Sequence, residues 1–360
     1  MYFLKVYNSA RTTQLAKFRR YISLDFQILL NKPYSGNTRV SVDDFEANLE
    51  TFSKYNRVSI YKGEIEKFRG YISDIRSEDT NVTIVLSSMM AFLKRRHITK
   101  TYPDQSVITT FEDIIDVMNA AYATEFTYGG TDLMSPTSEE FDFENTQVYE
   151  ALQSVVKSQS AELYVDEDDK IWILSQVGED KSDESLPTSV VFKYLEKKMV
   201  ETNIEKPNYT EEGMDLANYV IGKNTESPAK TSIKSDVPVG KDQLEKVVTF
   251  PDITSQDALD QATQDYLDKH KDPRKNPLII PLKDRMSESL YSIGDLCKIR
   301  LEYGFVDIDE NYRVVRKNYN VTNSGQEAKM TVELGSNSLT REDFFERIAN
   351  MDKRISDLQK

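Results

Sequence analysis

Residues 63–86 read GEIEKFRGYISDIRSEDTNVTIVL, and the chain continues directly into the basic stretch SSMMAFLKRRHI at 87–98. The second half of the first stretch alternates apolar and polar residues, which is typical of a half-buried β-strand. The first half is also strand-like, but its apolar positions change phase after Ile72, so we expect a bulge or bend at Gly70. Two antiparallel strands that lead into a short basic helix indicate a structural building block and not a catalytic centre.

The residues upstream of this hairpin predict more short strands. Residues 57–61 alternate in the same way, and Lys62-Gly63-Glu64 supplies a turn into the next strand. We expect residues 1–95 to form an antiparallel meander that closes on a small barrel, with a helix at 89–94 capping one end. The first β-barrel domain is therefore assigned to 1–98.

The next part of the chain, 99–186, predicts an α+β insert domain with its own small core. Apolar residues fall on one helical face near 110–118 and again near 146–158. The runs 161–165 and 170–174 then predict a hairpin across an acidic turn. Because two helices and a hairpin can cover a core, we expect this unit to lie outside the β modules as an insert.

Strand patterns return in the third domain, assigned to 187–337. We expect strands near 200–204 and 218–222, an exposed polar loop at 223–243, and a helix that starts near Ser255. A second β-barrel module follows, whose expected strands are 278–282, 297–301, 312–321 and 330–334. The fold class is thus mixed β and α+β, with two small β-barrel modules, an α+β insert and a C-terminal helix.

The C-terminal helix is assigned to 338–360, where Thr340 and the acidic residues after it predict a capped helix start. Its apolar residues recur at spacings of 4, 3, 4 and 3, which is a heptad seam that favours a coiled coil between subunits. An amphipathic helix that packs on its own barrel would show the same pattern. The seam residues are Phe344, Ile348, Met351, Ile355 and Leu358.

Composition excludes several classes of protein. The 360 residues suffice for about two to four compact units, and the net charge is 46 − 60 = −14. Such a charge repels phosphate backbones, which argues against sequence-specific nucleic-acid binding. One cysteine excludes a disulfide framework, and no apolar run is long enough for a signal peptide or a membrane span. We therefore expect synthesis in a cytoplasm.

The sequence contains no motif for catalysis, cofactor binding or metal binding. It lacks the glycine-rich phosphate loops and the GxSxG elbow, and its two histidines, His97 and His270, are far apart. Cys297 occupies an alternating apolar position, so it predicts a buried small residue. The acidic clusters 166–169 and 307–311 lack the glycine and closing glutamate of a calcium loop, and we expect both to be hairpin turns. We predict no catalytic, cofactor or metal residues, and no enzymatic activity.

The order of elements resembles bacteriophage tail hub proteins. The residues that carry the resemblance are Phe68-Arg69-Gly70-Tyr71-Ile72 with the basic helix after it, and Ser292-Ile293-Gly294-Asp295 before a strand of the second module. Over nearly its whole length the chain is similar to the prophage tail proteins of siphophages, which include tail-associated lysins and endopeptidase tail proteins. It is also similar to the baseplate hub of contractile tails.

This resemblance implies a structural virion protein at the tail tip, made in the host bacterial cytoplasm. In the family a homotrimer presents six similar barrels around a channel, which matches a sixfold tail tube or distal tail protein above it. A tip, fibre or tape-measure protein would follow on the other side, so the expected roles are genome ejection and host attachment. The net negative charge suits a conduit through which DNA slides. Many relatives carry a peptidase or receptor-binding part, and the 360 residues contain no such segment.

Three other interpretations stay open at this stage. A cell-wall hydrolase would need two carboxyls about 5–10 Å apart in a cleft, one of them with a raised pKa. A carbohydrate-binding module would use some of the 20 tyrosines as an exposed platform. A type VI secretion spike hub shares the predicted architecture with the phage hub.

Overall fold

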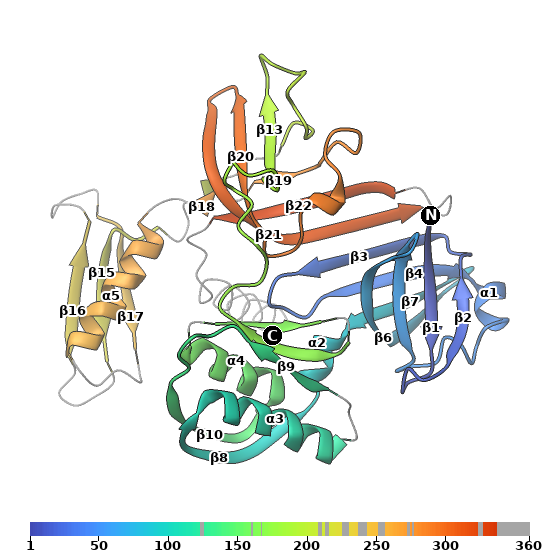
Figure 1. Ribbon diagram of the computed structural model, residues 1–360, viewed down its shortest axis with the longest axis horizontal. Helices are drawn as coiled ribbons and strands as arrows, with labels where there is room; N and C mark the ends of the chain where they lie inside the picture. Colours follow the sequence, from blue (N-terminus) through green and yellow to red (C-terminus); the bar gives the residue numbers. More distant parts are fainter. Residues whose placement is uncertain are drawn as a thin grey trace. The chain divides into compact units, whose positions relative to one another are not determined.

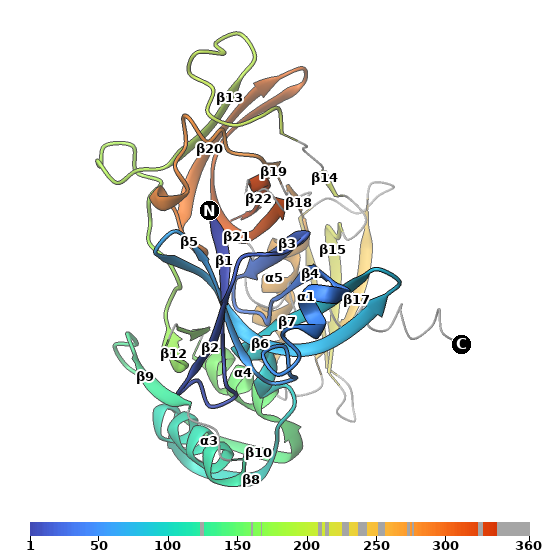
Figure 2. The ribbon, with the colours of Figure 1, turned by 90° about the vertical axis from the view of Figure 1, so that its right-hand side faces the viewer.

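The structure is a computed structural model of the chain (Figures 1 and 2). It describes residues 1–122, 126–159, 161–166, 168–207, 211–212, 216–224, 230–236, 243–250, 256–271, 274–275, 277–322 and 327–336. These residues fall into two compact units. The first comprises residues within 1–207 and 279–334, and the second comprises residues within 208–278 together with 335–336.

The N-terminal part of the first unit is a run of antiparallel strands, as predicted. Helix α1 (Val42–Glu46) begins where the Ser41 hydroxyl accepts a hydrogen bond from the backbone N–H of Asp44. The strands are β1 (Tyr2–Tyr7), β2 (Gln14–Phe18), β3 (Ser23–Leu29), β4 (Ser35–Ser41), β5 (Arg57–Lys62), β6 (Ile65–Glu78) and β7 (Asn81–Ser88).

The hairpin at 63–86 is confirmed as β6 and β7, but the bulge is not at Gly70. The pairing register shifts between Ile72 and Asp74, which produces the change of phase seen in the sequence. Gly70 instead allows a close approach of two strands, because a Cβ there would lie 2.1 Å from the carbonyl oxygen of Ser87. The alternating residues of β7 are buried, as expected for the core face: Val82, Ile84 and Leu86.

The C-terminal part of the first unit extends the same sheet. Its strands are β13 (Val191–Leu195), β19 (Leu278–Ile279), β20 (Leu296–Tyr303), β21 (Val306–Thr322) and β22 (Glu327–Ser336), with the short 3₁₀ helix η1 (Glu288–Leu290) before β20. Strand β21 is 17 residues long. Its first part pairs with β20 and its last part pairs with β3, so one strand joins the two β modules.

The mixed β and α+β class is confirmed. In place of two separate barrels, the modules form one 12-stranded sheet in the order β13-β20-β21-β3-β4-β7-β6-β5-β1-β2, with β19 and β22 beside this path. Among the described residues the path is open, with β2 and β13 as its end strands, and no closed barrel is found. The two modules share one sheet because β21 is long enough to pair with β20 in its first part and with β3 in its last part.

The predicted strand at 200–204 is wrong. The residues before Ile204 form turns, and Ile204 makes a single bridge to Pro281. The guanidinium of Arg285 donates to the backbone carbonyls of Met199 and Thr202, at 2.8 and 2.7 Å. A side chain therefore satisfies carbonyls that a strand ladder would otherwise have paired.

The insert region contains the two predicted helices and the predicted hairpin. Helices α3 (Val107–Tyr122) and α4 (Val148–Ser158) pack against β8 (His97–Ser106) and β10 (Ser138–Gln147), which form an antiparallel pair (Figures 1 and 2). The hairpin strands β11 (Glu162–Val165) and β12 (Lys170–Leu174) form a second sheet with β9 (Thr127–Thr131).

The core of the insert is continuous with the N-terminal strands. The helix predicted to cap the barrel, α2 (Met89–Leu93), buries Met89, Met90 and Leu93 in the same cluster as the apolar faces of α3 and α4. Tyr71 of β6 belongs to that cluster too. The sequence pattern could not reveal this, because an apolar helix face does not specify which neighbour covers it.

The second unit is a three-stranded sheet with one helix. Strand β15 (Tyr219–Lys223) lies between β16 (Thr231–Ser235) and β17 (Glu245–Thr249), and the predicted helix is α5 (Gln256–His270). A short pair, β14 (Glu211–Glu212) and β18 (Arg274–Lys275), completes its strands. The polar loop predicted at 223–243 is therefore wrong at 231–235, because β16 pairs with β15 there.

Candidate functional site

The predicted seam residues, Phe344, Ile348, Met351, Ile355 and Leu358, lie outside the described residues, so the coiled coil stays a prediction. Within the described part of the chain, no group of three metal-ligating side chains could hold an ion, and no helix is long and apolar enough to cross a membrane. The prediction for Cys297 is confirmed: it is fully buried in β20, and burial raises the pKa of its thiol to about 12.

The two acidic clusters have different roles. Asp166 organises the turn between β11 and β12, where its carboxylate accepts hydrogen bonds from the backbone N–H of Asp168 and from the indole of Trp172, each at 2.8 Å. That cluster is a hairpin turn, as predicted. The cluster 307–311 lies inside β21 instead, and Asp309 there pairs across the strands with Lys298 and Arg300 of β20. Cross-strand ion pairs explain this second cluster.

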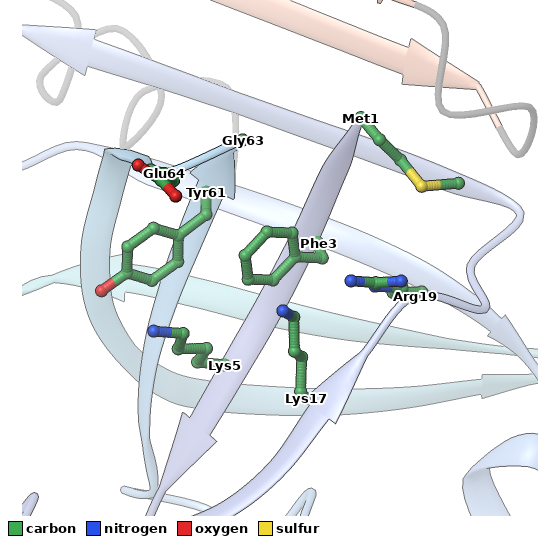
Figure 3. Close-up of a pocket in the computed structure, with 8 residues that line it drawn as sticks. All are labelled: Met1, Phe3, Lys5, Lys17, Arg19, Tyr61, Gly63 and Glu64. Carbon is green, nitrogen blue, oxygen red and sulfur yellow. The ribbon is translucent and has the colours of Figure 1, made fainter.

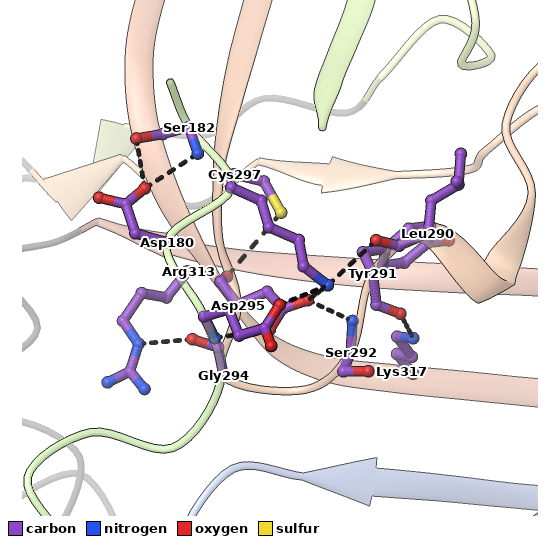
Figure 4. A network of polar contacts seen from close by, with 12 residues as sticks. Asp180, Ser182, Leu290, Tyr291, Ser292, Gly294, Asp295, Cys297, Arg313 and Lys317 are labelled. Atoms are coloured by element: carbon purple, nitrogen blue, oxygen red, sulfur yellow. Dashed lines mark hydrogen bonds and ion pairs between the residues drawn. The ribbon is translucent and has the colours of Figure 1, made fainter. Parts of the chain in front are cut away.

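The stretch Ser292–Asp295 directly precedes β20 and contacts residues 179–181, which follow the hairpin of the insert (Figure 4). Asp295 is buried at this junction. The Asp295 carboxylate is 1% exposed and accepts three hydrogen bonds. The donors are the backbone N–H of Ser292 (2.7 Å), the backbone N–H of Glu179 (2.9 Å) and the ammonium of Lys181 (2.7 Å). A single carboxylate therefore fixes the segment at 179–181 against the start of β20.

Two glycines make this close approach possible. Gly178 and Gly294 both have positive φ, +87° and +89°, and their backbones touch. A Cβ on Gly178 would lie 2.3 Å from the carbonyl carbon of Gly294. Both positions therefore need glycine for conformation and for space.

A second buried ion pair ties the insert to the large sheet at the same place. Arg313 of β21 forms a two-pronged contact with Glu162 of β11, at 2.7 and 3.1 Å. Arg313 also donates to the carbonyls of Val177 and Gly294, and Glu162 accepts from the backbone N–H of Val177. Glu162 is buried, Arg313 is 13% exposed, and both are hydrogen-bonded. Loss of Arg313 would leave the Glu162 charge uncompensated, and loss of a partner in a buried pair typically costs about 3–5 kcal/mol.

A third polar contact joins the N-terminal strands to η1. The Glu288 carboxylate lies 3.0 Å from the ammonium of Lys62 and 2.7 Å from that of Lys67, and it accepts a 2.6 Å hydrogen bond from the Tyr319 hydroxyl. Burial acts to raise the pKa of Glu288, but the hydrogen bonds from Lys67, Tyr319 and Lys62 outweigh it and lower that pKa to about 2. Glu288 therefore links β5 and β6, more than 220 positions earlier in the chain, to Tyr319 of β21.

Buried Lys317 lies close to this contact. Its ammonium donates to the carbonyl of Tyr291 at 2.7 Å and lies 4.2 Å from the centre of that ring (Figure 4). Burial lowers the pKa of Lys317 to about 8.

A basic and aromatic hollow of about 410 Å³ lies over β1, β2 and β5 (Figure 3). The rings of Phe3 and Tyr61 are stacked, with 5.4 Å between their centres. The ammonium of Lys5 lies 4.3 Å from the Tyr61 ring centre, and that of Lys17 lies 4.2 Å from the Phe3 ring centre. Arg19 also lies over Phe3, at 5.6 Å. Glu64 is the one carboxylate among the residues that line this hollow, against three cations. This basic–aromatic hollow therefore presents net positive charge at one end of the large sheet.

A second hollow, of about 320 Å³, bears on the hydrolase interpretation. Amide and hydroxyl side chains dominate its lining, and Asp25 is the one carboxylate among its described lining residues. Burial raises the pKa of Asp25, which suits an acid. A glycosidase mechanism needs a second carboxylate, and the hollow does not supply it.

Sequence reasoning missed both the basic–aromatic hollow and the buried ion pairs. The partners in each case are far apart in the chain, such as Glu162 and Arg313. One signal was present for the hollow: Lys17 and Arg19 alternate in a short strand-like run. The register that sets Lys5 opposite Lys17 appears only in the structure.

A scan of protein-family models finds no match, and no curated protein matches by sequence. Solved structures do match. The tail protein from Neisseria meningitidis MC58 has a TM-score of 0.65 at 11% identity, covering 94% of this chain and 98% of that chain. The 43 kDa tail protein of prophage MuSo2 from Shewanella oneidensis has a TM-score of 0.65 at 11% identity, covering 93% of this chain and 96% of that chain.

A type VI secretion component from E. coli, described as similar to the T4 bacteriophage tail proteins gp27 and gp5, also matches. Its TM-score is 0.52 at 10% identity, over 94% of this chain and 77% of that chain. The predicted resemblance to tail hub proteins is therefore confirmed at the level of the fold.

Proposed function

We propose that this chain is a structural protein of a bacteriophage tail tip or baseplate. In this role three copies form a hub ring, which joins a sixfold tail tube or distal tail protein to a threefold tip, fibre or tape-measure protein. The ring surrounds the path by which DNA leaves the virion. The observation that carries the proposal is the fold match along nearly the full length of two tail proteins, one of them from a prophage.

The internal construction suits the wall of such a ring. One continuous sheet joins the N-terminal and C-terminal strands through β21, and Glu288 links the same two parts through its contacts with Lys62 and Lys67. The net charge of −14 suits a passage that DNA does not adhere to.

The mass of the particle in solution tests the ring. We expect light scattering coupled to size exclusion, at high protein concentration and about 150 mM salt, to give three times the 41.5 kDa of one chain. Salt at this level matters because it screens the repulsion between copies beyond about 8 Å. A strictly monomeric mass under these conditions would contradict the proposal.

A spike hub of a type VI secretion system is the second candidate, because the E. coli component has a similar fold. The chain spans 77% of that protein but 98% and 96% of the Neisseria and Shewanella tail proteins, which favours the tail. Flanking genes for a tape measure and a distal tail protein would support the phage tail, whereas genes for a secretion sheath would support the spike.

We further propose that the chain has no enzymatic activity of its own. A zymogram on bacterial cell wall checks this, and the expected result is no cleared band. A cleared band that survives purification to homogeneity would instead support the hydrolase.

A further inference from the structure

The basic–aromatic hollow holds positive charges that have no ionic partner. Lys5, Lys17 and Arg19 form no ion pair with any carboxylate of the described residues, although the chain is strongly acidic. Nearby cations on β5 and β6 behave differently: Lys62 and Lys67 pair with Glu288, and Arg69 pairs with Glu66 at 2.8 Å. The lack of ion pairs thus distinguishes the cations of the basic–aromatic hollow from their neighbours on β5 and β6.

The strand register makes the arrangement unfavourable in an isolated chain. Lys5 of β1 lies directly opposite Lys17 of β2 in the antiparallel pair. Like charges in such positions repel each other, and the contacts with the rings of Tyr61 and Phe3 act against this repulsion. A local conflict of this kind is typical of a surface that meets a partner of opposite charge.

A segment with the matching charge lies on the insert region of the same protein. Strand β10 exposes carboxylates at three alternate positions: Glu140, Asp142 and Glu144. Glu140 and Glu144 form no ion pair among the described residues, and Asp142 accepts a 2.7 Å hydrogen bond from the Thr101 hydroxyl. Alternate residues of a regular strand are about 6.7 Å apart. Lys17 lies in β2 and Arg19 directly follows that strand, whereas the pairing of β10 with β8 shifts register beside Glu140 and Glu144.

The two surfaces are separate in one chain. Strand β10 pairs only with β8 in a two-stranded sheet, whereas β2 is the end strand of the large sheet and pairs only with β1. Each copy therefore presents one acidic and one basic surface. A contact between unlike surfaces of neighbouring copies is heterologous, and it closes into a ring when the rotation between copies is 120°.

We propose that the carboxylates of β10 in one copy dock into the basic–aromatic hollow of the next copy. This inference rests on the proposed trimer and assigns one of its subunit contacts. Lys17 and Arg19 meet the alternate carboxylates, and the stacked rings of Phe3 and Tyr61 hold the lysines in place. Complementary charges at such a contact set which surfaces pair and speed their association.

Charge reversal in the full chain tests the contact, with the mass of the particle as the readout. One variant carries Lys17→Glu and Arg19→Glu, a second carries Glu140→Lys and Glu144→Lys, and a third carries all four changes. We expect each pair of reversals alone to weaken trimer association by about tenfold or more. The four changes together should restore it to near the parent value, because the charges are again complementary.

Matched controls separate this contact from a general effect of net charge. Glu112→Lys with Asp116→Lys changes the charge by the same amount on exposed positions of α3, also in the insert region. Lys197→Glu with Lys198→Glu changes the charge by the same amount as Lys17→Glu with Arg19→Glu, at two other exposed positions. We expect both controls to assemble like the parent, and circular dichroism should confirm that every variant is folded.

The outcomes distinguish the contact from the ring. If the parent is trimeric and the four-change variant does not recover the loss, the proposed contact is wrong while the hub stands. If the Lys17 and Arg19 changes weaken the trimer but the Glu140 and Glu144 changes do not, the hollow contacts another acidic surface, and the role of β10 is wrong. A monomeric parent would overturn both the contact and the proposed function.

Discussion

At the scale of single residues, the molecule depends on polar groups buried at the places where distant segments meet. Asp295 accepts three hydrogen bonds, Arg313 pairs with Glu162, and Glu288 binds Lys67. A buried charge stabilises a fold only when its partners are all present, because the low local dielectric makes an unpaired charge costly. These residues therefore fix how the segments join, and removal of one partner destabilises the fold.

The Glu288 contact predicts a measurable pH dependence. The pKa of Glu288 is about 2 in the folded protein against 4.5 for the ordinary carboxyl, so its contribution is present above pH 4.5 and is lost as the pH falls toward 2. We expect the parent to exceed Glu288→Gln by about 2–3 kcal/mol in unfolding free energy at pH 7, and the difference to shrink across this window. Urea titrations at pH 7, 4 and 3 measure it, and a difference that does not depend on pH would contradict the assignment.

The contact between Gly178 and Gly294 predicts that alanine at position 178 destabilises the fold more than alanine at another glycine of positive φ. Gly178→Ala places a Cβ against the backbone of Gly294 at a positive φ, so we expect a loss of about 2–4 kcal/mol or failure to fold. Gly304→Ala is the matched control, because Gly304 also has a positive φ but nothing lies within 4 Å of its Cβ position. It should cost about 1 kcal/mol. Equal losses in thermal unfolding would show that contact with Gly294 is unimportant.

At the scale of elements, the insert region is coupled to the large sheet through α2. Leu93 of α2 is fully buried in the cluster formed by α3 and α4, and Tyr71 of β6 reaches the same cluster. Such a shared core means that the insert and the N-terminal strands unfold together. The expectation that the insert covers a separate core of its own therefore needs correction.

Leu93→Ala tests this coupling, and Trp172 gives a local probe. Trp172 is the one tryptophan in the sequence and lies on β12, whereas Leu93 precedes the insert on α2. We expect Leu93→Ala to lower the stability reported by Trp172 fluorescence by about 2–5 kcal/mol, because it leaves a cavity in the shared core. Leu290→Ala, at a half-exposed position, is the control and should change little. An unchanged Trp172 transition in the Leu93 variant would mean that the cores are independent.

At the scale of the whole molecule, assembly involves two proposed contacts of different kinds. The basic–aromatic hollow and β10 would meet around the ring through charge. The seam at 344–358 would bring three helices together on the axis through apolar side chains. A single helix of about 20 residues is marginal in water, so the seam needs this support from its neighbours.

The seam predicts the effect of a double substitution. Ile348→Asp with Ile355→Asp would place six carboxylates in a three-stranded seam, and we expect it to weaken trimerisation or the binding of a tip protein. Arg347→Asp with Lys353→Asp, off the seam, adds negative charge without entering it and serves as the control. Assembly and partner binding equal to the parent in the seam variant would show that the helix does not form an axial coiled coil.

The class of the fold and many of its elements follow from the sequence alone. Alternation of period two identified β5, β6, β7, β15, β20 and β22, and spacings of three and four identified α3, α4 and α5. These patterns are local, because each reports the face that one segment buries. The absence of catalytic motifs and the order of elements led to the tail hub resemblance, and the fold matches confirmed it at the level of the fold.

Tertiary structure decided how those elements join. The extension of β21 onto β3, the shared core around α2, and the opposition of Lys5 and Lys17 all depend on pairing between residues far apart in the chain. A periodic pattern states that a face is buried but not which face covers it, since burial of apolar area is not directional. Contacts such as Glu162 with Arg313 were beyond the sequence for the same reason: a charge pairs with whichever partner the fold brings near, and only the fold chooses that partner.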